Sequence, residues 1–350
     1  MYSITISLFC NVHYCMITTL ARRGLFLTPL LWLAGCNTVV LNPSGDIAAQ
    51  QAHLVVVSTL LMLLIIVPVM FLICWFAWKY RSSNKAAKFE PNWDHSTKLE
   101  LLIWGAPLLI IIVLGLITWI YTHLLDPYRP LSRLDENRPI AAGVKPLEVQ
   151  VVSMDWKWMF IYPEQGIATV NELITPVDVP VRFHMTSSSV MNAFYIPALA
   201  GMVYTMPGME TQLNAVMNKA GVYEGMSSNY SGAGFSDMHF KYHAVTQADF
   251  DAWVEKTKAS GESGALTRAK YVELDQPTIK HPIMHFSGVD KGLYDLALNR
   301  CAKEGTTCLN MQMHQDATRI QAFNAGQKLD KELCLPNETK TASAQPIRKQ

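Results

Sequence analysis

Two long uncharged runs restrict what this chain can fold into more than any other feature. Residues 54–78 and 101–122 contain no Asp, Glu, Lys or Arg. A helix rises about 1.5 Å per residue, so the first run spans roughly 37 Å and is long enough to cross a bilayer. A buried helix of a water-soluble domain is the alternative, but two such runs in succession argue against it. We expect a transmembrane hairpin with helices at 53–78 and 101–123.

The charges around these runs predict the orientation of the hairpin. The intervening loop, 79–100, carries five positive charges, whereas residues 37–52 carry none. Positively charged loops stay on the cytoplasmic side of the membrane. Residues 79–100 are therefore predicted to be cytoplasmic, and residues 36–52 and all residues after the second helix are predicted to be periplasmic. The five cations are Lys79, Arg81, Lys85, Lys88 and Lys98.

The N-terminus has the organisation of an export signal. Arg22 and Arg23 precede a short apolar run that ends in Leu-Ala-Gly before Cys36. Residues 1–35 are thus predicted to be a signal peptide. The segment Leu-Ala-Gly-Cys at 33–36 resembles the lipobox of bacterial lipoproteins, which implies a palmitate-bearing Cys36 as the mature N-terminus. The alternative is a chance cysteine beside an ordinary signal, and Met16 competes with Met1 as the start.

The rest of the chain reads first as strands and then as helices. Apolar and polar residues alternate along 177–185, and four aromatic residues, Trp156, Trp158, Phe160 and Tyr162, are placed on one face of another strand. Several short strands predict a β-sandwich at 124–245. Thr246 followed by Asp249 predicts a helix cap, and 246–336 is expected to be an aromatic-rich helical region. The polar end, 337–350, is predicted to be disordered.

Composition and cysteines narrow the function classes. The formal net charge of +1 gives no indication of nucleic-acid binding. No Cys-x-x-Cys pair occurs, which argues against a zinc ribbon or a thioredoxin-type motif. Cys301, Cys308 and Cys334 are predicted to be periplasmic, where a disulfide persists. Their pairing stays open.

Several motifs resemble one family. The segment Asp-Trp-Lys-Trp at 155–158 resembles the Trp-x-Trp segment of subunit II of haem-copper oxidases. The segments at 79–81, 91–93, 162–166 and 189–192 are similar to its quinol-oxidase branch. The chain is thereby identified as resembling subunit II of bacterial bo-type ubiquinol oxidases, the branch without copper in this subunit. The resemblance implies that the sandwich is cupredoxin-like.

The same resemblance places the ligands of the dinuclear copper site of cytochrome c oxidases. Thiolate and imidazole ligands suit copper, but here the ligand positions have changed, and the chain has no cysteine between Cys74 and Cys301. The resemblance therefore implies no metal and no cofactor in this chain. The changed positions are Asn192, Ser227, Asn229, Ser231 and Phe235, and only Met238 is retained.

The resemblance also implies partners and a function. Subunit I of such oxidases holds haems and copper, oxidises ubiquinol, reduces oxygen to water and translocates protons. This chain is expected to be its non-catalytic partner in the bacterial inner membrane, together with subunits III and IV and membrane lipids. In the family, a glutamate near the position of Glu100 lies at the mouth of a proton channel in subunit I, so Glu100 either has that place or is an ordinary interfacial carboxylate.

Three alternatives compete with this interpretation. One is a copper-bearing cytochrome c oxidase subunit II, which Ser227 and Ser231 disfavour. A second is a free-standing periplasmic ligand-binding lipoprotein, which predicts a protein stable without subunit I. The third is a menaquinol-using oxidase, which the sequence separates poorly from a ubiquinol-using one. The haem types also stay open.

Overall fold

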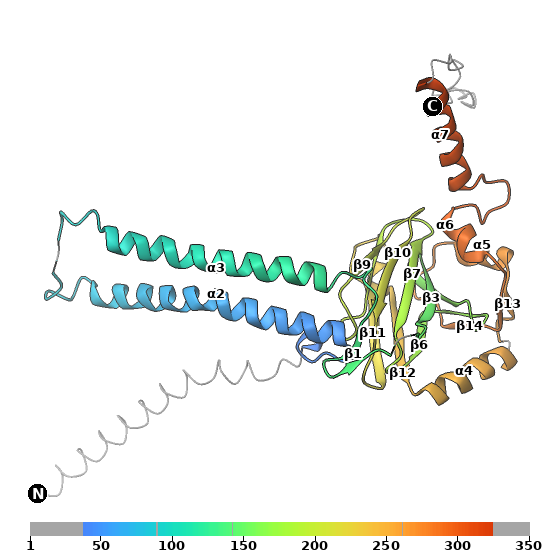
Figure 1. The fold of residues 1–350 in the computed structure, drawn as a ribbon, viewed down its shortest axis with the longest axis horizontal. Coiled ribbons are helices and arrows are strands. Elements are labelled where there is room, and N and C mark those ends of the chain that lie inside the picture. Colours follow the sequence, from blue (N-terminus) through green and yellow to red (C-terminus); the bar gives the residue numbers. More distant parts are fainter. Residues whose placement is uncertain (1–37, 89, 142, 261, 325–350) are drawn as a thin grey trace, which may run out of the picture. The chain divides into compact units, whose positions relative to one another are not determined.

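The computed structural model describes residues 38–88, 90–141, 143–260 and 262–324 (Figure 1). The predicted signal peptide, Cys36, Cys334 and the predicted tail at 337–350 lie outside these ranges. The described chain forms two compact units. The first unit contains the long helices up to Asp126 together with 135–138 and 197–201, and the second contains the remaining described residues.

The first unit is dominated by two long apolar helices, α2 (Asp46–Lys79) and α3 (Thr97–Leu124). A short helix, η1 (Val39–Leu41), precedes them. Both long helices are apolar and long enough to cross a membrane. Most of their large apolar side chains are exposed, as expected for helices that lipid or partner helices cover.

Helix α2 begins earlier than the predicted start at residue 53. The N–H groups of the first turn of a helix have no partner within the helix. Here the amide of Gly45 donates to the carbonyl of Ala198 at 2.9 Å, and the amide of Ala48 donates to that of Leu199 at 3.3 Å. Asp46 in this first turn suits the positive end of the helix dipole. Part of the predicted N-terminal segment at 36–52 is therefore helical.

The second unit is a β-sandwich, as predicted. A six-stranded sheet has the order β10-β7-β3-β4-β5-β14, and a five-stranded sheet has the order β6-β12-β11-β8-β9. Strand β3 runs parallel to β7, and β12 runs parallel to β6. The strands of the two sheets are β3 (Leu147–Met154), β4 (Lys157–Tyr162), β5 (Ile167–Val170), β6 (Glu172–Pro176), β7 (Val181–Ser187), β8 (Asn192–Tyr195), β9 (Val203–Thr205), β10 (Thr211–Ala215), β11 (Gly221–Ser227), β12 (His239–Val245) and β14 (Met284–Phe286). A separate two-stranded pair consists of β1 (Arg133–Asp135) and β2 (Arg138–Pro139).

An aromatic cluster fills the space between the two sheets. Trp158 and Phe160 of β4 meet Phe194 of β8 and Phe240 of β12, with ring centroids 5.0 to 6.4 Å apart. Phe194 and Phe240 are stacked with an interplanar angle of 8°. Trp156 does not share this face, which corrects the prediction. It lies in the β3–β4 turn with a positive φ of 65°, so the strand alternation begins only at Lys157.

The C-terminal region is helical as predicted, but it also contributes strands. Its helices are α4 (Gln247–Ser260), α5 (Arg268–Leu274), α6 (Leu293–Leu298) and α7 (Leu309–Asn324), and its short strands are β13 (Ala265–Leu266), β15 (Gly288–Val289) and β14. Strand β14 pairs with the open edge of β5 and extends the six-stranded sheet. Leu266, Tyr271 and Phe286 join a second core cluster with Met159 and Val170 of that sheet. The region is thus built into the sandwich.

Candidate functional site

The six positions that the resemblance aligns with copper ligands lie at one end of the five-stranded sheet. Asn192 begins β8, Ser227 ends β11, and Met238 immediately precedes β12. The other three lie in the segment between β11 and β12, residues 228–238, which we call the β11–β12 loop. It contains a short helix, η2 (Phe235–Asp237). Antiparallel pairing of β11 with β8 and with β12 brings these positions together.

Ser227 and Asn192 form a buried polar network at the centre of this group. The Ser227 hydroxyl lies 3.3 Å from Asn192 Oδ1 and 3.2 Å from the carbonyl oxygen of Asn229, so it can donate to one of them at a time. It accepts from the amide of Ala193 at 3.4 Å. The Asn192 side chain donates in turn to the carbonyl of Val190 at 3.3 Å. A hydroxyl and an amide therefore satisfy one another where a thiolate and an imidazole are expected in copper-bearing members.

The remaining positions are divided among separate contacts. Ser231 Oγ lies 3.9 Å from the sulfur of the buried Met238. Asn229 donates to the carbonyl of Met191 at 3.0 Å. Phe235 packs edge-on against Tyr230, with centroids 5.5 Å apart. The six side chains thus offer two hydroxyls, two amides and one thioether, and the phenyl ring of Phe235 offers no donor atom. This set does not fit a dinuclear copper centre.

Trp156 covers the β11–β12 loop from the neighbouring sheet. Its indole N–H donates to the carbonyl of Ser231 at 3.1 Å. Its ring lies so close to the loop that a Cβ on Gly234 would stand 2.4 Å from it, and one on Gly232 would stand 3.2 Å from it. The first of the two tryptophans in the Trp-x-Trp segment therefore holds this loop, whereas the second, Trp158, packs in the core.

Lys157, between the two tryptophans of the Trp-x-Trp segment, is a buried lysine. Its side chain is 0% exposed, and its ammonium group donates to the carbonyl of Gln276 at 2.8 Å and to the hydroxyl of Thr278 at 2.7 Å. The carbonyl of Asp155 lies at 3.4 Å. Burial lowers the pKa of Lys157, while the charges of Asp275 and Asp155 act in the opposite direction. The only sequence indication was its position between two tryptophans.

A second polar cluster lies where β6, β12 and β14 approach one another. Glu172 lies 2.6 Å from His285 Nε2 and 3.2 Å from His243 Nε2. The hydrogen bond and charge of His285 hold the pKa of Glu172 below its usual range, and the hydrogen bond that His285 donates to Glu172 raises the pKa of His285. In the described ranges, no three His, Cys, Asp or Glu side chains gather so as to hold a metal ion.

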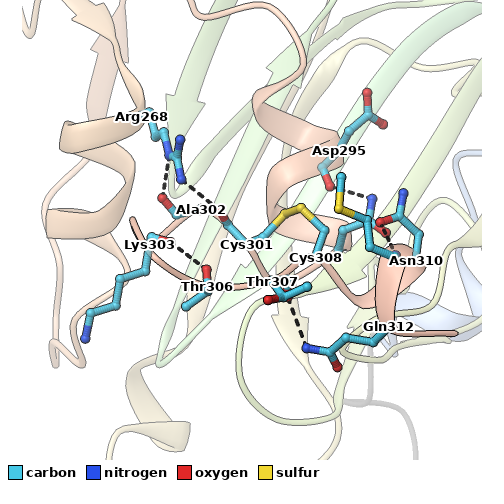
Figure 2. Close-up of a disulfide and its surroundings, with 12 residues drawn as sticks. Arg268, Asp295, Cys301, Ala302, Lys303, Thr306, Thr307, Cys308, Asn310 and Gln312 are labelled. Atoms are coloured by element: carbon cyan, nitrogen blue, oxygen red, sulfur yellow. Dashed lines mark hydrogen bonds between the residues drawn. A yellow bond between two sulfur atoms is a disulfide. The ribbon is translucent and has the colours of Figure 1, made fainter. Parts of the chain in front are cut away.

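The other predicted site residues make separate contacts within their own units. Glu100 is in the first turn of α3 and lies 2.7 Å from His95 Nδ1. Cys301 and Cys308 form a disulfide, a pairing that the sequence left open (Figure 2). Arg268 of α5 donates to the carbonyls of Ala302 and Cys301, at 2.7 and 3.1 Å, and so holds one end of the loop that the disulfide closes.

The fold and these motifs define a class of protein. Residues 162–245 match the model of the periplasmic domain of cytochrome c oxidase subunit II, and residues 258–305 match the COX aromatic-rich motif. The chain thus has a cupredoxin-like outer domain of subunit II type, followed by the aromatic-rich segment that packs on it.

Curated relatives identify the branch. The chain is 46% identical to cytochrome bo(3) ubiquinol oxidase subunit 2 of Pseudomonas putida, over 77% of this chain and 83% of the relative. It is 44% identical to ubiquinol oxidase subunit 2 of Acetobacter aceti, over 86% of this chain and 96% of the relative. It is 39% identical to quinol oxidase subunit 2 of Bacillus cereus, over 72% of this chain and 84% of the relative. The chain belongs to the ubiquinol oxidase subunit 2 family.

Proposed function

We propose that this chain is subunit II of a terminal oxidase that oxidises ubiquinol, reduces oxygen to water and translocates protons. In this role it is a non-catalytic partner of the haem-copper subunit I. The haems and the copper of the complex belong to subunit I, and this chain carries no redox centre. Subunits III and IV complete the assembly.

The observation that carries this proposal is the polar network at the predicted ligand positions. Ser227 and Asn192 are buried and hydrogen-bonded to one another and to the backbone. A neutral hydroxyl cannot replace a thiolate in a copper centre. Loss of that centre suits a quinol donor, because quinol delivers electrons within the membrane and needs no docking site for a soluble cytochrome.

The location follows from the helices and the outer domain. Two candidate membrane helices and a domain of periplasmic type fit an oxidase subunit of the inner membrane. We further propose that Cys36 is lipidated and adds an anchor beside the two helices. For Glu100, whose carboxylate lies 2.7 Å from His95 Nδ1, we propose a position at the entrance of the proton path of subunit I.

A tagged purification tests the proposal against its alternatives. The full chain is tagged at its C-terminus and purified from native membranes in mild detergent. We expect haem to co-purify, and we expect no electron paramagnetic resonance spectrum of a mixed-valence dinuclear copper centre. Recovery of a stable, haem-free chain would favour a free-standing lipoprotein instead. A dinuclear copper spectrum assigned to this chain would favour a cytochrome c oxidase subunit.

A further inference from the structure

A short segment of the aromatic-rich region lies against the turn that carries Trp156. This segment, residues 276–281, which we call the strap, connects α5 to β14. The amide of Thr278 lies 3.5 Å from the carbonyl of Asp155. Further along, the carbonyl of His281 accepts from the side chain of Asn171 at 2.8 Å. The strap therefore spans from the β3–β4 turn to the start of β6.

Lys157 is the centre of this contact. An ammonium group is buried without large cost only where acceptors replace its water. Here the carbonyl of Gln276, the hydroxyl of Thr278 and the carbonyl of Asp155 face the three N–H bonds of the buried group. Two of the three acceptors belong to the strap, so the cation joins the strap to the turn.

The turn and the strap both contact the β11–β12 loop. Trp156, adjacent to Lys157, donates to the carbonyl of Ser231 and lies against Gly234. The strap itself reaches the loop through Lys280, whose ammonium group lies 3.8 Å from Asp237 Oδ1 in η2. Single-residue contacts thus join the three segments: Lys157 joins the turn to the strap, Trp156 joins the turn to the loop, and Lys280 joins the strap to the loop.

We infer that the strap, through Lys157, holds the β11–β12 loop. In copper-bearing members of the superfamily, the copper ions that this loop binds would do so instead. A bound metal fixes the chain segments that supply its ligands, and a loop without its metal needs other contacts to stay ordered. Lys157 is a positioning residue that acts through Trp156. The replacement of copper rests on the proposed function, whereas the holding of the loop rests on the contacts alone. A role for the aromatic-rich region follows: it immobilises this end of the outer domain.

Amide hydrogen exchange of the assembled oxidase tests the inference. The variant Lys157→Met keeps an unbranched side chain that is one heavy atom shorter, and it removes the cation. We expect exchange in the β11–β12 loop to rise about tenfold or more, since a hydrogen-bonded charge is lost, with little change in β3 and β7. The matched control is Lys241→Met, which removes an exposed lysine paired with Glu224.

A gentler pair of variants keeps the test decisive if Lys157→Met fails to assemble. Thr278→Val removes one acceptor, whereas Thr278→Ser retains it. We expect faster loop exchange in the valine variant and rescue in the serine variant. Unchanged loop exchange in both Lys157→Met and Thr278→Val would overturn the inference, as would an equal rise across all strands. Failure of the proposed function is separate, since it would appear as absent ubiquinol oxidation by the unmodified complex.

Discussion

At the scale of single residues, small changes of side-chain chemistry account for the character of the site. Serine and cysteine differ by one atom, yet Ser227 takes part in an ordinary hydrogen-bond network. That network is satisfied by its own neighbours, so the buried position carries no orphaned group that a metal would have to satisfy. Trp156 likewise makes an ordinary hydrogen bond, from its indole N–H to the carbonyl of Ser231, and covers the β11–β12 loop.

The close approach of Trp156 to Gly234 gives a prediction. Gly234 has φ −97°, which alanine also adopts, so the cost of Gly234→Ala comes from the clash with the ring. We expect a loss of about 1–3 kcal/mol in unfolding free energy from this overpacking, measured by denaturant unfolding of the purified chain in detergent. Gly105→Ala in α3 is the control, because nothing lies within 4 Å of its new Cβ.

A double variant separates the clash from other effects. Adding Trp156→Ala to Gly234→Ala removes the obstructing ring. The unfolding free energy lost by the double variant should therefore be smaller than the sum of the losses of the two single variants. Strictly additive losses would show that the ring does not restrict this position.

The ion pair of Glu172 and His285 predicts a dependence of stability on pH. The pKa of His285 is raised above its usual 6.5, so its contribution is present below that value and is lost as pH rises through the raised pKa. The pKa of Glu172 is lowered from 4.5, so its contribution is present above that value and is lost as pH falls through the lowered pKa. The pair therefore stabilises the docking of β14 most between these limits.

The variant His285→Gln tests this dependence. Melting temperature measured across the pH range should fall on the alkaline side in the unmodified protein, and this fall should be smaller in the variant. His314→Gln on the exposed part of α7 serves as the control and should leave the profile unchanged. An identical alkaline fall in all three proteins would contradict the assignment to His285.

At the scale of elements, the spacing of apolar and charged residues predicted the helices and strands that depend on local sequence alone. The uncharged runs predicted both long helices, and Thr246 caps α4 as expected, accepting from the amide of Asp249 at 3.2 Å. The strand alternation predicted the sandwich. The start of α2 was predicted too late because its first turn is satisfied by the carbonyls of Ala198 and Leu199, which are distant in sequence.

The elements of the aromatic-rich region show why the rest could not be predicted. Strand β14 has only three residues, too few to display a period, and it exists because β5 offers an open edge. The role of Lys157 depends on partners at Gln276 and Thr278, more than a hundred residues away. The six ligand positions came from resemblance alone, since no local pattern marks them.

The disulfide fixes where α7 begins. It closes a short loop with a sequence separation of 7, and Leu309 directly after it packs so close to Gly208 that a Cβ there would stand 2.4 Å from its side chain. In the chain-entropy model, such a loop contributes roughly 2.5 kcal/mol. We expect reduction to speed proteolysis within 302–324, measured by limited digestion with and without reductant.

A double variant controls for other effects of the reductant. The chain with Cys301→Ala and Cys308→Ala should be cleaved rapidly in both conditions and should no longer respond to reductant. A difference between reduced and oxidised samples of this variant would show that reductant acts elsewhere. Equal cleavage of the oxidised and reduced native chain would show that the disulfide does not hold α7.

At the scale of the whole molecule, the chain consists of a membrane part and an outer part with different requirements. The exposed apolar surfaces of α2 and α3 require lipid or partner helices. The outer domain has its own core, and the side chains at the six positions discussed above take part in hydrogen bonds and packing within it. This division suits a subunit that supports the chemistry of its partner.

In the proposed function, electrons reach the complex from quinol without a copper centre in this chain. Oxygen uptake by the complex purified from native membranes tests it most directly, with ubiquinol and with reduced cytochrome c offered separately as donors. We expect rapid oxygen uptake with ubiquinol and none above background with cytochrome c. Uptake driven by cytochrome c at a comparable rate would contradict the proposed function, because an entry site for a soluble donor would then exist.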